Sequence, residues 1–248
     1  NRGRRRGGRC TVVMHALIDA DYLVYLCGFA AQKTYYLVTV DEGIVGEYDN
    51  KPDANACLEK YEMQVPFLWE RVEVEPVENA LHSCKKQLEY IISRVADQFD
   101  MDVKPALYLT GSGNFREQIA TIKPYKGNRK PWHKPRLHGE VQEYLREVWD
   151  AKRVHKMEAD DMVAILQTKG MADGIDTVIC SIDKDLLQVP GWHYLCHKDE
   201  FVEIDEEEGE VRLYRQIVSG DPTDNIPGAY RVGEAKAAAL IEYGMTTA

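Results

Sequence analysis

The chain has 248 residues, enough for one large α/β domain or for one domain with a small appendage. Hydrophobic residues make up 44% of it and charged residues 29%, as in an ordinary globular protein, and no apolar run approaches the roughly 18 residues that indicate a transmembrane helix. The formal net charge of −10 argues against a surface that attracts nucleic acid everywhere.

The cysteines argue against a zinc site and against a disulfide framework. They are widely scattered, and no two have the spacing of paired metal ligands. This use of cysteine fits a reducing interior. The six positions are Cys10, Cys27, Cys57, Cys84, Cys180 and Cys196.

Basic residues concentrate in one stretch of this acidic chain. From Arg116 to Arg136 there are seven basic residues and one acid, Glu117, whereas acids cluster from Glu203 to Glu210. Charges act locally, because salt screens them within about 10 Å at moderate ionic strength. The sequence therefore predicts a polarised molecule with one region that attracts phosphate.

The first nine residues are Asn-Arg-Gly-Arg-Arg-Arg-Gly-Gly-Arg, with nothing apolar to pack. We expect residues 1–13 to form a disordered basic tail. A targeting or nucleic-acid-binding tail is one interpretation. The interpretation we favour is that sequence upstream of a natural start at Met14 is included.

The first half of the chain predicts a strand, a helix, a hairpin and a long helix. The run at residues 14–18 is apolar except for His15 and precedes two aspartates, and residues 22–31 have a helical pattern. Residues 35–40 and 44–48 flank an Asp-Glu-Gly turn and read as a hairpin. We assign neither structure nor function to residues 51–76. Residues 77–99 carry apolar side chains at helical spacing.

The second half alternates strands and helices. We expect a short strand at residues 106–109, a helix near 139–151, a helix at 159–169 and a strand at 177–182, then short helices after Arg215. Strands that alternate with helices predict a mainly parallel sheet with helices on both faces.

Acidic residues follow the predicted strands at the edge where open α/β sheets bind ligands. Each group has an ordinary alternative: acids at a helix start cap free N–H groups, Asp221 and Asp224 fit a turn, and Asp183 and Asp185 fit a solvated strand end. Taken together they are harder to dismiss, because so many carboxylates repel one another unless cations neutralise them. The eight are Asp19, Glu158, Asp160, Asp161, Asp183, Asp185, Asp221 and Asp224.

An all-oxygen site of this kind suits Mg²⁺ or Mn²⁺. Two such ions are the usual apparatus of phosphodiester hydrolysis, in which they activate water and stabilise the charge on the attacking and leaving oxygens. The basic stretch adds the cationic surface that a phosphate substrate needs.

Six blocks, in this order, resemble the flap-endonuclease/5′-exonuclease superfamily, and most closely the small 5′-exonucleases of T7-like phages. They run from about residue 15 to residue 240. The blocks are Leu17-Ile-Asp19-Ala-Asp21, Asn114-Phe-Arg116, Tyr125-Lys-Gly-Asn-Arg129-Lys130, Met157-Glu-Ala-Asp-Asp161, Ser181-Ile-Asp-Lys-Asp185 and Ser219-Gly-Asp-Pro-Thr-Asp-Asn-Ile-Pro-Gly228.

The resemblance implies a PIN-like α/β nuclease domain over residues 14–218, with a basic helical arch at about 112–138. A helix–three-turn–helix element that binds duplex DNA would occupy residues 219–248, truncated at Ala248. The family's metals imply two Mg²⁺ or Mn²⁺ ions and one K⁺ at the helix–three-turn–helix element. Its biology implies a monomer in the cytoplasm of a phage-infected bacterium.

The resemblance also assigns roles to residues. Asp19, Glu158, Asp160 and Asp161 would mainly hold the first metal ion, and Asp183, Asp185, Asp221 and Asp224 the second. Lys126 and Arg129 match catalytic basic residues at the foot of the arch that contact the scissile phosphate, and Tyr125 matches an aromatic that stacks on a base. Without the resemblance this stretch reads as a generic phosphate patch or a solvated basic loop. The implied nucleic-acid-binding residues are Arg116, Lys123, Tyr125, Lys126, Arg129, Lys130, Gly228, Arg231, Gly233 and Lys236.

Two substitutions depart from the family pattern. Gly111 stands where the family has an aspartate that binds metal, a position that Ser112 or water could fill. Arg231 stands where the duplex-binding hairpin often has glycine, which puts the K⁺ site in doubt and could add a phosphate contact. For Gly228 and Gly233, ordinary turn geometry is the alternative explanation.

The leading hypothesis is metal-dependent hydrolysis of a phosphodiester near a 5′ end, a flap or a single-strand/duplex junction of DNA or of an RNA–DNA hybrid. One rival is a structure-specific DNA-binding protein that has lost catalysis, for which Gly111 is the motive. Another is a PIN-type ribonuclease acting on single-stranded RNA.

Overall fold

The computed structural model describes residues 13–41, 43–61, 66–128 and 134–246. The chain forms two compact units. The first combines residues 1–22, 86–133 and 144–248, and the second combines residues 23–85 and 134–143. The predicted tail at residues 1–13 lies almost wholly outside the described residues.

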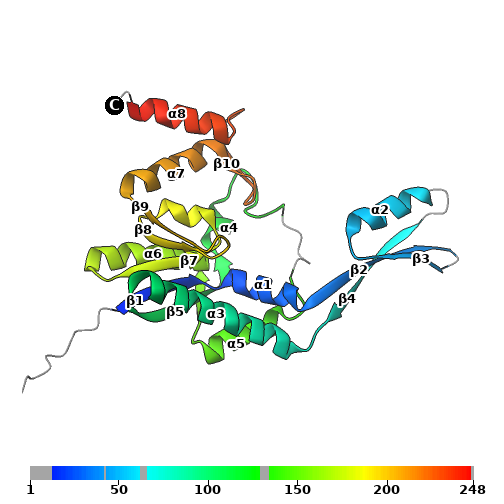
Figure 1. The fold of residues 1–248 in the computed structure, drawn as a ribbon. Coiled ribbons are helices and arrows are strands. Elements are labelled where there is room, and N and C mark those ends of the chain that lie inside the picture. Colours follow the sequence, from blue (N-terminus) through cyan, green and yellow to red (C-terminus); the bar gives the residue numbers. More distant parts are fainter. Residues whose placement is uncertain (1–12, 42, 62–65, 129–133, 247–248) are drawn as a thin grey trace, which may run out of the picture. The chain divides into compact units, whose positions relative to one another are not determined.

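The first unit is built on a six-stranded sheet with the order β6-β5-β1-β7-β8-β9 (Figure 1). Every neighbouring pair is parallel except β8 and β9. The carboxyl ends of five strands therefore lie along one edge, where ligands of such sheets bind. The strands are β1 (Val13–Asp19), β5 (Asp102–Asn114), β6 (Lys152–Lys156), β7 (Thr177–Ser181), β8 (Gly191–Leu195) and β9 (Glu200–Ile204).

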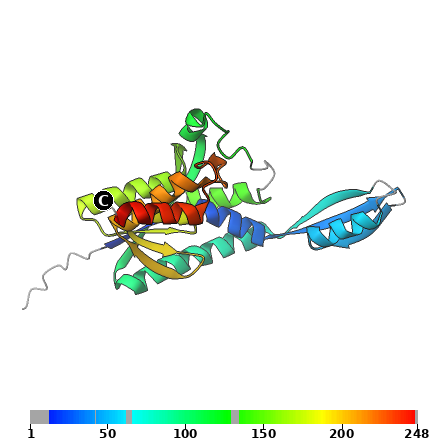
Figure 2. The same cartoon turned by 90° about the horizontal axis from the view of Figure 1, so that it is seen from above.

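Helices cover both faces of this sheet (Figure 2). Helix α6 (Ala159–Asp173) packs on one face, where its Val163 joins Leu17, Ile179 and Leu186 in a buried cluster. On the other face lies the part of α3 (Val77–Phe99) that belongs to this unit. The remaining helices are α4 (Phe115–Ile119), the 3₁₀ helix η2 (Lys184–Gln188), α7 (Glu206–Ser219) and α8 (Glu234–Thr246).

A short antiparallel hairpin connects α7 to α8. Strands β10 (Gly220–Asp221) and β11 (Ile226–Pro227) pair across the turn that contains Asp224. The hairpin and α8 occupy the segment at 219–248 that was predicted to bind duplex DNA, and α7 ends where this segment begins. The duplex-binding role stays a prediction.

The second unit holds a three-stranded antiparallel sheet with the order β3-β2-β4. Strand β2 (Gln32–Val40) is central, flanked by β3 (Gly43–Tyr48) and β4 (Phe67–Val74). Helix α2 (Lys51–Lys60) begins at an Asn50 cap and buries Ala54 and Cys57 against Val38. Two further helices, α1 (Asp21–Ala30) and α5 (His138–Val148), continue along the chain from one unit into the other.

The fold class predicted from the sequence is confirmed. The long helix at 77–99 and the hairpin at 35–48 are present, and the helices near 139–151 and at 159–169 and the strand at 177–182 lie within four residues of their predicted bounds. The strand predicted at 106–109 is the middle of the longer β5, α7 begins well before Arg215, and β6, β8 and β9 were not predicted. The region left without assignment contains α2 and β4. A helical arch at 112–138 stays a prediction: α4 is the only helix described between residues 115 and 137, and residues 129–133 lie outside the description. Among the described residues, no helix is long and apolar enough to span a membrane.

Candidate active site

A cleft of about 450 Å³ lies at the carboxyl edge of the main sheet, and it gathers most of the predicted site residues. Seven of the eight predicted acids line it, together with the predicted basic and aromatic residues of the Arg116–Lys126 region. The lining residues that had been predicted are Arg116, Tyr125, Lys126, Glu158, Asp160, Asp161, Asp183, Asp185, Asp221 and Asp224.

The ends of two parallel strands place the first acids. Asp19 is the last residue of β1, and Asp183 follows β7 and caps η2, where its carboxylate accepts the Asp185 N–H at 2.9 Å. Ser181 links the two strand ends, because its hydroxyl donates to Asp19 at 3.2 Å and accepts the Asp183 N–H at 3.1 Å. The sheet thus holds these carboxylates in fixed register.

Asp19 does not line the cleft and is only 9% exposed. Burial raises the pKa of its carboxyl to about 7, and the charges of Asp21 and Asp160 add to the effect. Asp21 is a further acid at this point that the site prediction left out. Its carboxylate accepts the Thr110 N–H at 3.1 Å, so it also ties α1 to β5.

The start of α6 supplies three acids in different electrostatic states. Glu158 and Asp161 form a capping box, as the alternative interpretation proposed. Burial and the charges of Glu158 and Asp161 raise the pKa of Asp160 to about 6. Burial would also raise the pKa of Asp161, but the hydrogen bonds from Arg116 outweigh it and hold that pKa below its ordinary value. One turn therefore serves both as a helix cap and as a wall of the cleft.

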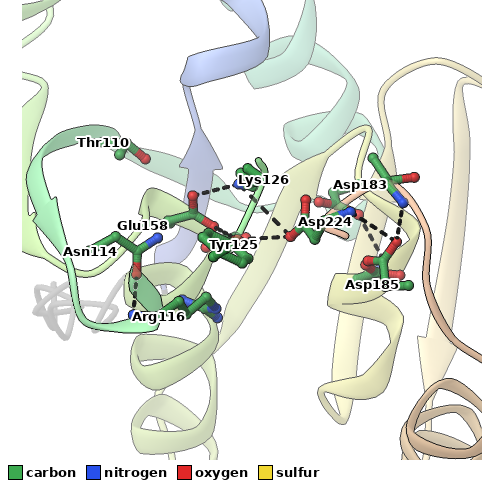
Figure 3. A network of polar contacts seen from close by, with 12 residues as sticks. Thr110, Asn114, Arg116, Tyr125, Lys126, Glu158, Asp183, Asp185 and Asp224 are labelled. Carbon is green, nitrogen blue, oxygen red and sulfur yellow. Dashed lines mark hydrogen bonds and ion pairs between the residues drawn. The ribbon is translucent and has the colours of Figure 1, made fainter. Parts of the chain in front are cut away.

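Two cationic side chains and one tyrosine already contact several of these acids. Arg116 makes a two-pronged contact with Asp161, at 2.6 and 2.7 Å. The Tyr125 hydroxyl lies 2.7 Å from a Glu158 carboxylate oxygen and 2.8 Å from one of Asp224, so the two acids share its single proton as acceptors. Lys126 donates to Glu158 at 2.5 Å (Figure 3). Burial and these two carboxylates raise the pKa of the Tyr125 phenol well above its ordinary value.

The segment around Lys126 is anchored on the turn that carries Asp221 and Asp224. The Lys126 N–H donates to the Asp224 carbonyl at 3.0 Å, Asn128 donates to Pro222 at 2.8 Å, and Asn225 donates to Pro124 at 2.9 Å. Asp221 orders the turn itself by accepting the Thr223 N–H at 2.8 Å. These contacts bring residues about a hundred positions apart to one wall, which no local pattern in the sequence could reveal.

Among the described residues, five other predicted nucleic-acid-binding residues do not line the cleft: Lys123, Gly228, Arg231, Gly233 and Lys236. Lys123 and Lys236 are exposed, and Arg129 and Lys130 lie outside the described residues. Arg231 has a left-handed backbone with φ +58, which explains why a glycine is expected there, and its guanidinium stacks on Tyr230. Gly228 allows the close approach of β11 to Ser219, since a β-carbon would overlap that backbone. If Gly228 has no role in binding DNA, close backbone packing explains the glycine better than turn geometry does.

Gly111, the position of the missing family aspartate, lies on β5 against β6. A β-carbon there would overlap the Val154 carbonyl oxygen and stand 2.8 Å from His155 Nδ1. Ser112 contacts the same His155 nitrogen at 3.2 Å, and neither Gly111 nor Ser112 lines the cleft. The structure therefore does not place Ser112 as a substitute ligand.

The cleft also has a polar wall that the sequence did not reveal. Gln188 donates to Gln216 at 2.5 Å, and Gln216 donates to Asp221 at 3.4 Å. Burial raises the pKa of Asp185, and a hydrogen bond from Gln216 opposes that rise. Gln216 lies on α7, five residues before Asp221 in the sequence. No sequence motif marks α7 as part of the site.

The chemistry of the donor set fits hard divalent cations. All these acidic side chains offer oxygen, and burial together with neighbouring carboxylates raises the pKa of Asp19 and Asp160, so a bound cation would favour their ionised forms. Within the described ranges, however, no three acidic, histidine or cysteine side chains stand ready as a complete metal site. Arg116, Tyr125 and Lys126 now occupy carboxylate oxygens of Asp161, Glu158 and Asp224.

Parts of the chain are similar to known proteins. No family model matches the chain. The DNA polymerase I of Rhizobium leguminosarum is 38% identical over 97 residues, which cover 35% of this chain and 10% of that protein. The flap endonuclease Xni of Shewanella piezotolerans is 29% identical over 135 residues, covering 50% of this chain and 52% of that one. The chain thus spans at most about half the length of these relatives.

Solved structures agree in fold. The bacteriophage T5 D15 flap endonuclease, solved as a pseudo-enzyme-product complex with DNA and metal ions, matches with a TM-score of 0.54 and 13% identity, over 93% of this chain and 74% of that one. The resemblance to the 5′ nucleases is confirmed. The fold shared with these nucleases places the acids after β1, β6 and β7 at one edge of the sheet.

Proposed function

We propose that this chain is a structure-specific 5′ nuclease that hydrolyses phosphodiester bonds with two divalent metal ions. The observation that supports this most strongly is the single cleft that joins seven acids to Arg116, Tyr125 and Lys126. Acids alone would suit a simple cation site, and bases alone would suit a phosphate patch. Both together suit a phosphodiester whose hydrolysis builds negative charge.

When bound, two Mg²⁺ or Mn²⁺ ions would supply activated water and stabilisation of the charge on the attacking and leaving oxygens. The residues proposed to hold them are Asp19, Glu158, Asp160, Asp161, Asp183, Asp185, Asp221 and Asp224. Asp19 and Asp183 are the most firmly positioned, since Ser181 connects them to the sheet.

Arg116 and Lys126 would exchange partners during this reaction. Each now pairs with a carboxylate that a metal ion would take over, and each would then be free to bind a substrate phosphate. Both side chains are about one quarter exposed, so a phosphate entering the cleft can reach them. Charge-assisted bonds of this kind are worth roughly 1.5–3 kcal/mol each.

The substrate we propose is DNA with a 5′ end, a flap or a single-strand/duplex junction. The relatives support this class: one is called a flap endonuclease, and the T5 structure is a complex with DNA. The segment from α7 to α8 would hold the duplex, with Gly228, Arg231, Gly233 and Lys236 nearby. A K⁺ ion at this segment and an RNA–DNA hybrid substrate are part of the same proposal.

The deciding experiment is cleavage of a 5′-labelled flap duplex at low salt, with Mg²⁺, with Mn²⁺ and with chelator. Metal-dependent release of short 5′ products is expected, and Asp183→Asn is expected to abolish it while largely sparing binding. Undiminished cleavage by Asp183→Asn at saturating Mg²⁺ would contradict the site. Tight binding without cleavage in either metal would indicate a DNA-binding protein, and preferential cutting of single-stranded RNA would indicate a PIN-type ribonuclease.

A further inference from the structure

A second recess, of about 230 Å³, adjoins the proposed catalytic cleft. The two cavities share part of their lining, so a molecule in the cleft can extend into the recess. The shared residues are Lys184, Asp185, Gln188, Gln216, Asp221 and Thr223. Arg212 and Arg215 line the recess but not the catalytic cleft.

One face of α7 forms a wall of this recess. Arg212, Arg215, Gln216 and Ser219 all line it, and their spacing places them on a single helical face. Lys184 comes from η2, between Asp183 and Asp185 in the sequence. Three cationic side chains from two elements therefore meet at one hollow, although the proposed catalytic roles involve none of them.

The present partner of Arg212 is weak and replaceable. Its Nη2 donates to Glu208 at 2.5 Å, in a pair whose side chains are 40% and 44% exposed. Exposed pairs at this helical spacing are worth only about 0.3–0.5 kcal/mol. In the described part of the chain, the buried Nε of Arg212 finds no hydrogen-bond acceptor. Glu208 thus occupies only the Nη2 nitrogen of the guanidinium.

We propose that Lys184, Arg212 and Arg215 form a subsite for a backbone phosphate of the nucleic-acid substrate. A guanidinium fork matches a phosphate in shape, and charge-assisted bonds to phosphate exceed the Glu208 pair that they would replace. The recess also carries the acids Asp185, Asp221 and Glu234. Asp185 and Asp221 belong to the shared wall, where the proposed metal ions would offset their charge, so this subsite rests on the proposed function.

The test is the salt dependence of binding. The wild-type chain and variants are titrated with a labelled 5′-flap duplex, with Ca²⁺ in place of Mg²⁺, over a series of KCl concentrations. Each phosphate contact contributes about 0.9 to the slope of log Kd against log salt. We expect Arg212→Gln and Arg215→Gln each to lower that slope by about one and to weaken binding several-fold at low salt.

Two matched variants separate a phosphate contact from a general effect. Lys169→Gln also removes one charge, but Lys169 is exposed and lies eleven residues beyond Glu158 on α6, about 16 Å along the helix axis. It should leave the slope unchanged. Glu208→Gln frees the Arg212 guanidinium and should tighten binding, a result that a purely structural role for Arg212 would not produce. Circular dichroism and thermal unfolding check that each variant is folded.

The outcomes distinguish the two proposals. Tight binding by the wild type with equal slopes for Arg212→Gln, Arg215→Gln and Lys169→Gln overturns the subsite and leaves the proposed function standing. An absence of flap binding by the wild type overturns both. In a parallel arm, inorganic phosphate is tested for thermal stabilisation. If it stabilises the wild type but not Arg212→Gln, while the duplex slopes stay equal, the recess binds free anions and the subsite is again overturned.

Discussion

At the scale of single residues, burial decides the properties of the site more than residue type does. Asp19, Asp160 and Asp161 are all acids on the same edge, yet the pKa of the first is raised to about 7, that of the second to about 6, and that of the third is lowered. The sequence could place the three together. It could not predict the order of their pKa values, because that order depends on burial and on the guanidinium of Arg116.

Asp19→Asn should stabilise the metal-free protein at alkaline pH. The folded-state pKa of about 7 exceeds the model-peptide value, so the unfolded chain releases this proton first and stability falls as pH rises through about 7. The gain from Asn should be near zero below about pH 4 and on the order of 2–4 kcal/mol at pH 8. Urea unfolding in chelator, at several pH values, measures it. A gain that does not change with pH would contradict the argument.

Gly111→Asp should fail to create a better nuclease. The β-carbon of the new side chain would overlap the Val154 carbonyl oxygen. We therefore expect a loss of about 1–3 kcal/mol in the free energy of unfolding. Cleavage in saturating Mg²⁺ should not rise above the wild type. Gly113→Ala is a useful comparison for backbone effects, because its strain comes from a φ of +72 and not from a neighbour. Higher activity in a fully stable Gly111→Asp would refute this.

At the scale of elements, the sequence predicted best those segments that carry their own periodic pattern. Helix α3 was predicted at its observed bounds, because Leu88, Ile91 and Val95 are buried at helical spacing. Helix α2 was missed, since it buries only Ala54 and Cys57. Helix α7 was missed in its first half because the acids after Asp205 were recognised only as a charge cluster, whereas Asp205 caps the helix.

The hairpin between α7 and α8 should depend on Gly228 far more than on Gly233. A β-carbon at Gly228 would overlap the Ser219 backbone, whereas no described atom lies within 4 Å of one at Gly233. We expect Gly228→Ala to cost about 1–3 kcal/mol and to disturb Asp221 and Asp224, and Gly233→Ala to change stability by less than about 1 kcal/mol. Thermal unfolding measures both. Equal effects of the two substitutions would show that the pairing of β10 with β11 does not hold the turn.

At the scale of the whole molecule, the separation of acidic and basic segments could be predicted from the sequence. The contacts between these segments could not. The basic stretch and the eight acids could be recognised as two groups in the sequence. The structure shows that they meet: Lys126 contacts Glu158, and Arg116 contacts Asp161. Such contacts depend on where the segment from Pro124 to Asn128 docks, and that is set by hydrogen bonds to a turn about a hundred residues away.

This arrangement predicts that divalent metal binding releases protons in acidic buffer. Asp19 and Asp160 must be ionised to hold an ion, and their pKa values of about 7 and about 6 leave much of both protonated at pH 6. We expect Mg²⁺ or Mn²⁺ to displace about one to two protons at pH 6 and almost none above pH 8. Calorimetric titrations in two buffers with different ionisation heats measure the number. Identical heats in the two buffers at pH 6 would mean that the ions bind without Asp19 and Asp160, and the first metal position would then have to be assigned to other oxygens of the cleft.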